Sequence, residues 1–210
     1  MVVIHYTAMA SARAAAETLC NPKTEVSAHY LIAQDGEVIS LVPEALRAWH
    51  AGVGRWGAVK DVNSRSIGIE LANTGSTPFA AAQMDALIAL LQGIFQRWGM
   101  RPERVIGHSD MAPGRKIDPG VHFDWRRLAV EGVSVWPQPG LVALGLADQA
   151  QFLSLCRIFG YTATVDQSML LDTFRRRFRP WAKGPLDTTD IMMMSDLAQR
   201  FPVDVNAAWV

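Results

Sequence analysis

The chain has 210 residues, 20 basic and 20 acidic side chains and a hydrophobic content of 50%. These values are typical of one core-forming domain with a small appendage, and no apolar run approaches the roughly 20 residues that a transmembrane helix needs. The formal net charge of zero gives no support for a nucleic-acid partner or for capture by an anionic membrane surface.

The N-terminus and the two cysteines bear on the compartment. Met1 stands directly before an apolar, β-branched stretch, with no basic segment, apolar segment or small-residue cleavage site ahead of it. We therefore expect a cytoplasmic protein; the alternative is a periplasmic or outer-membrane-anchored protein whose N-terminal segment has been removed. Cys20 and Cys156 are expected to be buried free thiols in different domains.

The first third of the chain combines short strands with one helix. Residues 2–6 are β-branched and apolar, as in a buried strand, and residues 11–20 form an alanine-rich helix. Residues 28–33 and 37–42 flank a turn at Gly36, which is typical of a β-hairpin.

A strand with two different faces follows at residues 66–71. Three apolar residues alternate there with small or polar ones. The strand is therefore expected to turn its apolar side chains to the core and Glu70 to the other face, where Ser66 and Gly68 leave room beside it.

A long helix and another strand complete this part of the chain. Thr77 and Pro78 resemble an N-cap followed by proline at the first helical position, and apolar residues then fall on one face until Gly99. Residues 105–108 are expected to form a short strand. The pattern predicts an α/β fold, with a central mixed β-sheet flanked by helices.

The composition changes to proline and glycine at residues 136–146, which predicts a linker. Beyond it, three apolar stripes with helical spacing predict a small C-terminal three-helix domain over residues 147–210, separate from a first domain at residues 1–135. The arginines at 175–177 and 179 are interpreted as a basic helix end that complements the helix dipole, with binding of an anionic polymer as the less favoured alternative.

Six short motifs occur in one characteristic order. In chain order they are Val3-Ile4-His5-Tyr6-Thr7, Ser27-Ala28-His29-Tyr30-Leu31-Ile32, Trp49-His50-Ala51-Gly52, Ser66-Ile67-Gly68-Ile69-Glu70-Leu71, Gly107-His108-Ser109-Asp110 and Arg115-Lys116-Ile117-Asp118-Pro119-Gly120. This series resembles the zinc-dependent N-acetylmuramoyl-L-alanine amidases, a grouping that includes the peptidoglycan-recognition proteins. The likeness is greatest to the bacterial anhydro-muropeptide amidases, and the tail after Trp136 resembles the helical peptidoglycan-binding domain attached to some of them.

The resemblance implies a catalytic zinc site. His5, His108 and Asp118 match the family's ligands, and two imidazoles with one carboxylate suit one tetrahedral Zn²⁺ whose fourth position stays open. Glu70 matches the base that moves a proton from water to the leaving nitrogen, and Lys116 matches the cation that stabilises the oxyanion. Taken singly, each of these residues has an ordinary structural interpretation as a core histidine, a turn residue or a solvated charge.

The roles of the remaining histidines are more open. Trp49 and His50, with Arg47 nearby, resemble the family's substrate-contact segment, and Arg47 is suited to pair with a carboxylate of the stem peptide. His29 and His50 each have three possible roles: metal ligand, partner that orients a ligand, or cleft residue that contacts substrate. For His29 we favour a cleft or structural role, and His122 is expected to be structural or on the surface.

We predict a bacterial hydrolase that cuts the amide between N-acetylmuramic acid, or its anhydro form, and L-alanine of the stem peptide. Its expected partners are peptidoglycan fragments (anhydro-muropeptides) or peptidoglycan itself, in cell-wall recycling or turnover. Two alternatives remain: a non-catalytic peptidoglycan-recognition module, which the complete ligand set speaks against, and a zinc peptidase of other specificity.

Overall fold

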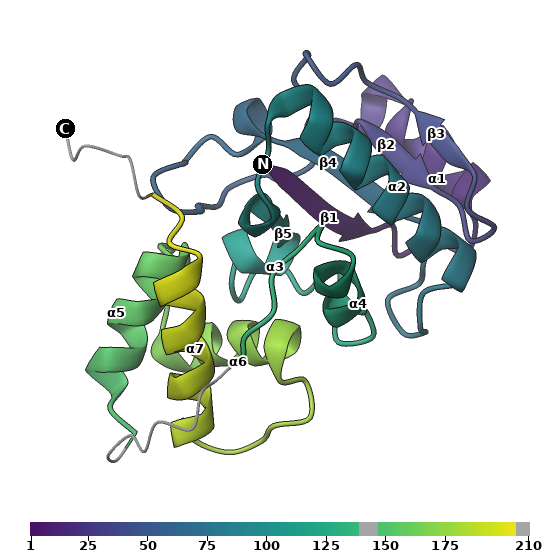
Figure 1. The fold of residues 1–210 in the computed structure, drawn as a ribbon. Helices are drawn as coiled ribbons and strands as arrows, with labels where there is room; N and C mark the ends of the chain where they lie inside the picture. The colour runs from purple at the N-terminus through teal and green to yellow at the C-terminus, as the bar shows by residue number, and fades with distance from the viewer. Residues whose placement is uncertain (139–146, 205–210) are drawn as a thin grey trace.

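A five-stranded sheet forms the centre of the computed structural model, which describes residues 1–138 and 147–204 (Figure 1). The strands are β1 (Val2–Tyr6), β2 (Tyr30–Ile32), β3 (Val38–Ser40), β4 (Ile67–Leu71) and β5 (Val105–Gly107). Their order is β3-β2-β4-β1-β5, and all neighbours are parallel except the β2–β3 hairpin. The predicted mixed sheet flanked by helices is confirmed.

The described residues include helices on both sides of this sheet. They are α1 (Ala12–Leu19), α2 (Ala81–Trp98), α3 (His108–Met111), α4 (Trp125–Val130), α5 (Gln149–Phe159), α6 (Gln167–Phe178) and α7 (Thr188–Arg200). None of them combines the length and the apolar character that crossing a membrane would require.

The predicted helix starts are confirmed only in part. The helix predicted at residues 11–20 is α1, and Ser11 caps it, since its side chain accepts a hydrogen bond from the Ala14 amide at 3.2 Å. The predicted start of α2 at Thr77-Pro78 is wrong, since the helix begins at Ala81. The Asn73 side-chain amide donates to the carbonyls of Thr77 and Pro78, at 3.2 and 3.4 Å, and so holds this segment as a loop.

One face of the sheet packs against α2 and α4. Its apolar layer contains, among others, Val2, Ile4, Ile67, Ile69, Leu71 and Val105 from the strands and Met84, Leu87, Leu91, Ile94, Trp125 and Leu128 from the helices. All of these side chains are buried. The layer is continuous because every second residue of each strand points to this side.

The opposite face of the sheet is covered in two separate pieces. Leu31 packs against α1 at one end, and Val3 and Ile106 pack against the C-terminal helices at the other. Between these pieces lie His5 and Glu70, which are paired in the parallel register of β1 and β4. They lie toward the carboxyl ends of the strands, where open α/β sheets bind ligands.

The helices α5, α6 and α7 gather at one end of the molecule, beside α3 and β5 (Figure 1). Their apolar side chains, among them Phe152, Phe159, Phe174, Phe178 and Met194, share one cluster with Val3, Trp56 and Met111 of the sheet region. The backbone joins the two regions as well, since the Gly57 amide donates to the Gly160 carbonyl at 2.9 Å. The three helices are as predicted; the domain boundary stays a prediction, and residues 139–146 of the predicted linker lie outside the described residues.

Both cysteines are free, but only one is buried. Cys156 is fully buried among the C-terminal helices, whereas Cys20 is exposed at the end of α1. The expectation that Cys20 is buried is therefore wrong, because Cys20 caps the C-terminal end of α1, a helix that buries only Ala15.

Candidate active site

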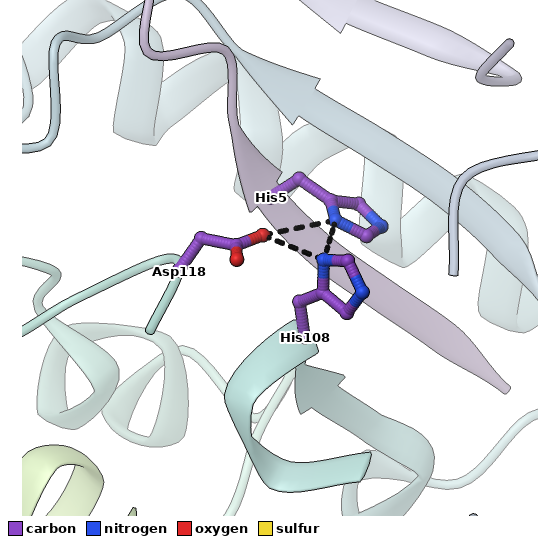
Figure 2. A group of neighbouring side chains, drawn as sticks. All are labelled: His5, His108 and Asp118. Carbon is purple, nitrogen blue, oxygen red and sulfur yellow. Dashed lines mark hydrogen bonds and ion pairs between the residues drawn. The ribbon is translucent and has the colours of Figure 1, made fainter. Parts of the chain in front are cut away.

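Three side chains predicted as ligands meet at the carboxyl ends of the strands (Figure 2). His5 comes from β1, His108 from the first residue of α3, and Asp118 from the loop that follows α3. The two imidazole Nδ1 atoms are 2.9 Å apart, and each lies 3.0 Å from Asp118 Oδ2. All three side chains are buried.

A backbone carbonyl determines the tautomer of His108. The Nε2 atom lies 2.8 Å from the carbonyl oxygen of Ala51. Because a carbonyl can only accept, Nε2 carries the hydrogen and donates it. In its neutral form the ring therefore presents the lone pair of Nδ1 to His5 and Asp118.

A chain of hydrogen bonds determines the tautomer of His5. The Ser66 hydroxyl donates to the Val62 carbonyl at 2.5 Å, so its oxygen accepts from His50 Nε2 at 3.2 Å. Burial, the main cause, lowers the pKa of His50 well below its usual range, which keeps this ring neutral. The bare His50 Nδ1 then accepts from His5 Nε2 at 3.0 Å. His5 Nδ1 is thus left with a lone pair that faces the cluster.

His5 and Asp118 are in the protonation states that a bound metal ion would require. Burial, helped by the neighbouring His108, lowers the pKa of His5 to about 4. The pKa of Asp118 lies below its usual value, so this group is an ionised carboxylate at neutral pH. Two imidazole lone pairs and one carboxylate oxygen thus face one another, and they repel unless a cation lies between them. The donor set fits a divalent metal ion.

A cavity of about 560 Å³ opens beside the three ligands. Its lining includes, besides the ligands, Tyr6, Met9, Leu19, Trp49, His50, Glu70, Arg115 and Lys116. The structure therefore brings Glu70, Lys116, Trp49 and His50 to the candidate metal site, as their predicted roles require.

Glu70 has the properties of a proton carrier. Within residues 1–138 and 147–204, its buried Oε2 atom has no hydrogen-bond partner. Burial raises the pKa of Glu70 to about 8; the negative charge of Asp118 adds to this shift, and Lys116 opposes it. A carboxyl group with a pKa near neutrality can both accept and release a proton under physiological conditions.

Two residues predicted to contact substrate lie outside the cavity. His29 is fully buried, where its Nε2 donates to the Leu46 carbonyl at 3.0 Å and its Nδ1 accepts from the Gly68 amide at 2.9 Å. Arg47 donates to Asp61 at 2.8 Å and to Ser64, and its guanidinium lies 4.1 Å from the centre of the Trp49 ring. Contact of His29 or Arg47 with substrate stays a prediction. His122 is exposed, as expected.

Sequence reasoning assigned no role to two further residues beside the ligands. Arg115 lines the cavity, and its Nη2 donates to the carbonyls of Ala51 and Val53 at 2.7 and 2.5 Å. Asp110 is buried next to the ligand-bearing end of α3. Both residues stand inside the motifs that contain His108 and Asp118, and this position is the sequence signal that could have identified them.

The fold and the site define an α/β protein with a buried two-histidine, one-aspartate site beside a glutamate. Residues 1–121 match the model of the N-acetylmuramoyl-L-alanine amidase family. The sequence is 37% identical to the N-acetylmuramoyl-L-alanine amidase AmiD of Escherichia coli over 97% of this chain and 84% of that protein. The chain belongs to the N-acetylmuramoyl-L-alanine amidase family.

Solved structures extend the similarity to the C-terminal helices. The structure of AmiD from E. coli with the substrate anhydro-N-acetylmuramic acid-L-Ala-D-gamma-Glu-L-Lys superposes with a TM-score of 0.86 at 33% identity, covering 96% of this chain and 89% of that one. AMPDH3 from Pseudomonas aeruginosa in complex with anhydromuramic pentapeptide gives a TM-score of 0.87 at 34% identity, covering 96% and 92%. By contrast, AmpD of Enterobacter cloacae, a 1,6-anhydro-N-acetylmuramyl-L-alanine amidase, is 47% identical over only 49% of this chain and 54% of its own length.

Proposed function

We propose that this chain is a zinc-dependent amidase that hydrolyses the bond between N-acetylmuramic acid, including its anhydro form, and L-alanine of the stem peptide. The observation that carries the proposal is the convergence of two imidazole lone pairs and one carboxylate oxygen beside the unpartnered carboxyl group of Glu70. Family membership supports the choice of bond.

His5, His108 and Asp118 would hold one zinc ion. Nitrogen and carboxylate oxygen are both ordinary zinc ligands, and three protein ligands leave a further position open. When bound, zinc would supply the Lewis acidity that activates a water and polarises the amide carbonyl. The protein has to provide the proton transfers and the stabilisation of negative charge.

Glu70 would carry the proton. Its carboxylate takes a proton from the attacking water and delivers it to the amide nitrogen, which cannot leave as an anion. The position of Glu70 in register with His5 keeps its carboxyl group beside the ligands on the same face of the sheet. The desolvation that raises its pKa also makes it a stronger base.

Lys116 would stabilise the charge that develops on the carbonyl oxygen. It precedes the ligand Asp118 by two residues and lines the same cavity. A preorganised ammonium group in a partly desolvated cavity stabilises an oxyanion more strongly in the transition state than the neutral carbonyl in the ground state.

We propose anhydro-muropeptides as substrates, in cell-wall recycling or turnover. AmiD and AMPDH3, which match nearly the whole chain, were both solved with ligands of this class. The exposed Trp49 ring, beside His50 at the cavity, is suited to contact the sugar or the peptide. We propose in addition that residues 1–135 form the catalytic domain, because all of these groups lie within them.

Metal analysis and product identification test the proposal together. The purified protein should contain one zinc per chain, and His108→Ala should lose both the zinc and the activity. Mass spectrometry of digested anhydro-muropeptides should show free sugar and a peptide that begins with L-alanine. Cleavage within the peptide would indicate a zinc peptidase. Binding without cleavage, or stoichiometric zinc in His108→Ala, would contradict the proposal.

A further inference from the structure

The junction between β5 and α3 carries a buried carboxylate that is not a ligand. Asp110 stands two residues after His108, and one of its oxygens, Oδ2, accepts a hydrogen bond from the Gly107 amide at 2.7 Å. This bond holds the first turn of α3 in place, and His108 is the first residue of that turn. The position of Asp110 therefore helps to set the position of His108.

The partners that hold Asp110 come from the C-terminal helical region. Arg177 of α6 donates from Nη1 to Asp110 Oδ2 at 2.6 Å, and the Tyr161 hydroxyl donates to Asp110 Oδ1 at 2.8 Å. The Arg177 and Asp110 side chains are 2% and 1% exposed, so water hardly screens the ion pair. This location shows that Arg177 is more than part of the basic helix end that the sequence suggested.

Arg177 reaches past Asp110 into the sheet region. Its Nη2 atom donates to the carbonyl of Val105 in β5 at 3.1 Å and to the Ser134 hydroxyl at 3.3 Å. Its guanidinium also lies 4.1 Å from the centre of the Trp125 ring of α4. One side chain from α6 thus binds the strand before His108 and the helix that begins with it.

The same helix also locates the third ligand. The Ser109 amide donates to the backbone carbonyl of Asp118 at 2.9 Å. Gly107 lies against Pro119 so closely that an added Cβ would come within 2.8 Å of its ring. A shift of α3 would therefore move His108 and disturb the loop that presents Asp118.

We propose that Arg177 and Tyr161 are positioning residues for the metal site, which makes the C-terminal helices part of the ligand-orienting structure. The inference rests on the zinc site proposed above and deepens it. Hydrogen-bonded partners of metal ligands typically raise metal affinity by about 10- to 100-fold, because they fix the orientation of the ligands before the metal binds. Here this support comes from more than 50 residues away along the chain, through the helix that begins with His108.

Arg175 provides a matched control on the same helix. It is also a buried arginine of α6, and it pairs with a buried aspartate, Asp190, at 2.5 Å. Its other hydrogen bonds go to the carbonyls of Gly184 and Pro185, so within residues 1–138 and 147–204 its hydrogen bonds and ion pairs stay in the C-terminal region. Loss of either arginine removes a buried ion pair, but of the two pairs only that of Arg177 joins α6 to α3.

The experiment compares zinc affinity in the full chain by competition with a chromophoric chelator. It uses wild type, Arg177→Met, Arg177→Lys, Asp110→Asn, Tyr161→Phe and Arg175→Met, at a temperature at which circular dichroism shows every variant folded. We expect Arg177→Met and Asp110→Asn to bind zinc about 10-fold or more weakly. Arg177→Lys should recover part of the loss, and Arg175→Met should match wild type. The combination of Asp110→Asn with Arg177→Met should cost less than the sum of the two single changes.

Wild-type zinc affinity in Arg177→Met would overturn the inference, even if its melting temperature falls. An equal loss of affinity in Arg175→Met would also overturn it, since general loosening of the helices would then explain both. If Arg177→Met does not fold, the zinc affinity of Tyr161→Phe tests the inference instead, because this variant keeps the ion pair and removes one hydrogen bond to Asp110. Wild-type zinc affinity in Tyr161→Phe would then overturn the inference. Absence of zinc from the wild-type protein would instead contradict the proposed function.

Discussion

The two faces of the sheet are covered in different ways. A continuous apolar layer under α2 and α4 covers one face, where Ile4, Ile69 and Leu91 are completely buried. The other face is covered in two pieces, with His5 and Glu70 in the gap between them. Because strand side chains alternate, Ile69 and Glu70 are neighbours in sequence but serve opposite faces. We therefore expect a substitution of Ile69 to change mainly stability, and a substitution of Glu70 to change mainly catalysis.

We expect the largest effect from substitutions on the site face, which is the face of the sheet that carries His5 and Glu70. The property affected should be catalytic activity. Glu70→Gln and Lys116→Ala should each lower kcat by about 10²- to 10⁴-fold while zinc content stays at the wild-type level. Glu70→Gln should also raise the melting temperature at neutral pH, because burial raises the pKa of Glu70 to about 8 in the folded chain and so favours the unfolded chain, in which the carboxyl group ionises freely. Steady-state kinetics, metal analysis and thermal denaturation check these outcomes. Near-normal kcat, or lost zinc, would show that the assigned role is wrong.

A substitution on the α2 face should have the opposite signature. Leu91→Ala removes a fully buried side chain from the apolar layer and should lower the free energy of unfolding by about 2–5 kcal/mol. Denaturant titration measures this loss. The kcat of the folded, zinc-loaded fraction should not change. A large fall in kcat would mean that the two faces are more strongly coupled than their separate coverage suggests.

A single added methyl group on the site face should affect both properties. A Cβ at Gly68 would lie 2.3 Å from His50 Cγ, so Gly68→Ala must displace the ring that orients His5. We expect a loss of about 1–3 kcal/mol in stability, together with weaker zinc binding. Gly99→Ala is the control: at the end of α2, with φ of +57° and nothing within 4 Å, it should cost about 1 kcal/mol and leave zinc binding unchanged. Similar zinc affinities in the two variants would contradict the role of His50.

The smallest effect concerns an ion pair at the edge of the sheet, away from the site. Hydrogen bonds from Arg97, and from Tyr30 and Trp98, lower the pKa of Glu44 to about 2 against the opposing effect of burial. Because the folded-state pKa lies below the usual value of 4.5, these contacts stabilise the fold above about pH 4.5 and are lost as the pH falls toward 2. Glu44→Gln should therefore show a shallower loss of stability over this range. An unchanged slope would mean that the contacts contribute nothing measurable.

The sequence predicted those features that depend on local pattern. The alternation around Glu70 identified both the strand and the face on which its carboxyl group lies, since a strand has a period of two residues. The C-terminal helix stripes were recognised in the same way, from their 3.6-residue period. The grouping of His5, His108 and Asp118 came from the order of family motifs, because no local spacing links residues more than 100 positions apart.

The features that the sequence did not reveal depend on partners far along the chain. Nothing beside Arg177 in the sequence distinguishes it from Arg175, yet one pairs with Asp110 and the other with Asp190. Thr77-Pro78 has the composition of a helix start, but hydrogen bonds from Asn73 hold it as a loop. His29 looks like a cleft residue in its motif, and only the fold shows both of its ring nitrogens bonded to backbone.

The orientation of the ligands has a consequence for protein design. The hydrogen-bond chains behind His5 and His108 end on the backbone carbonyls of Val62 and Ala51. The lone pairs that face the candidate metal site are therefore set by the path of a loop, in addition to the choice of three side chains. Transplanting only the two histidines and the aspartate onto another parallel sheet would leave their tautomers undefined. A graft that preserves metal affinity would have to carry the segment from residue 50 to residue 66 as one unit.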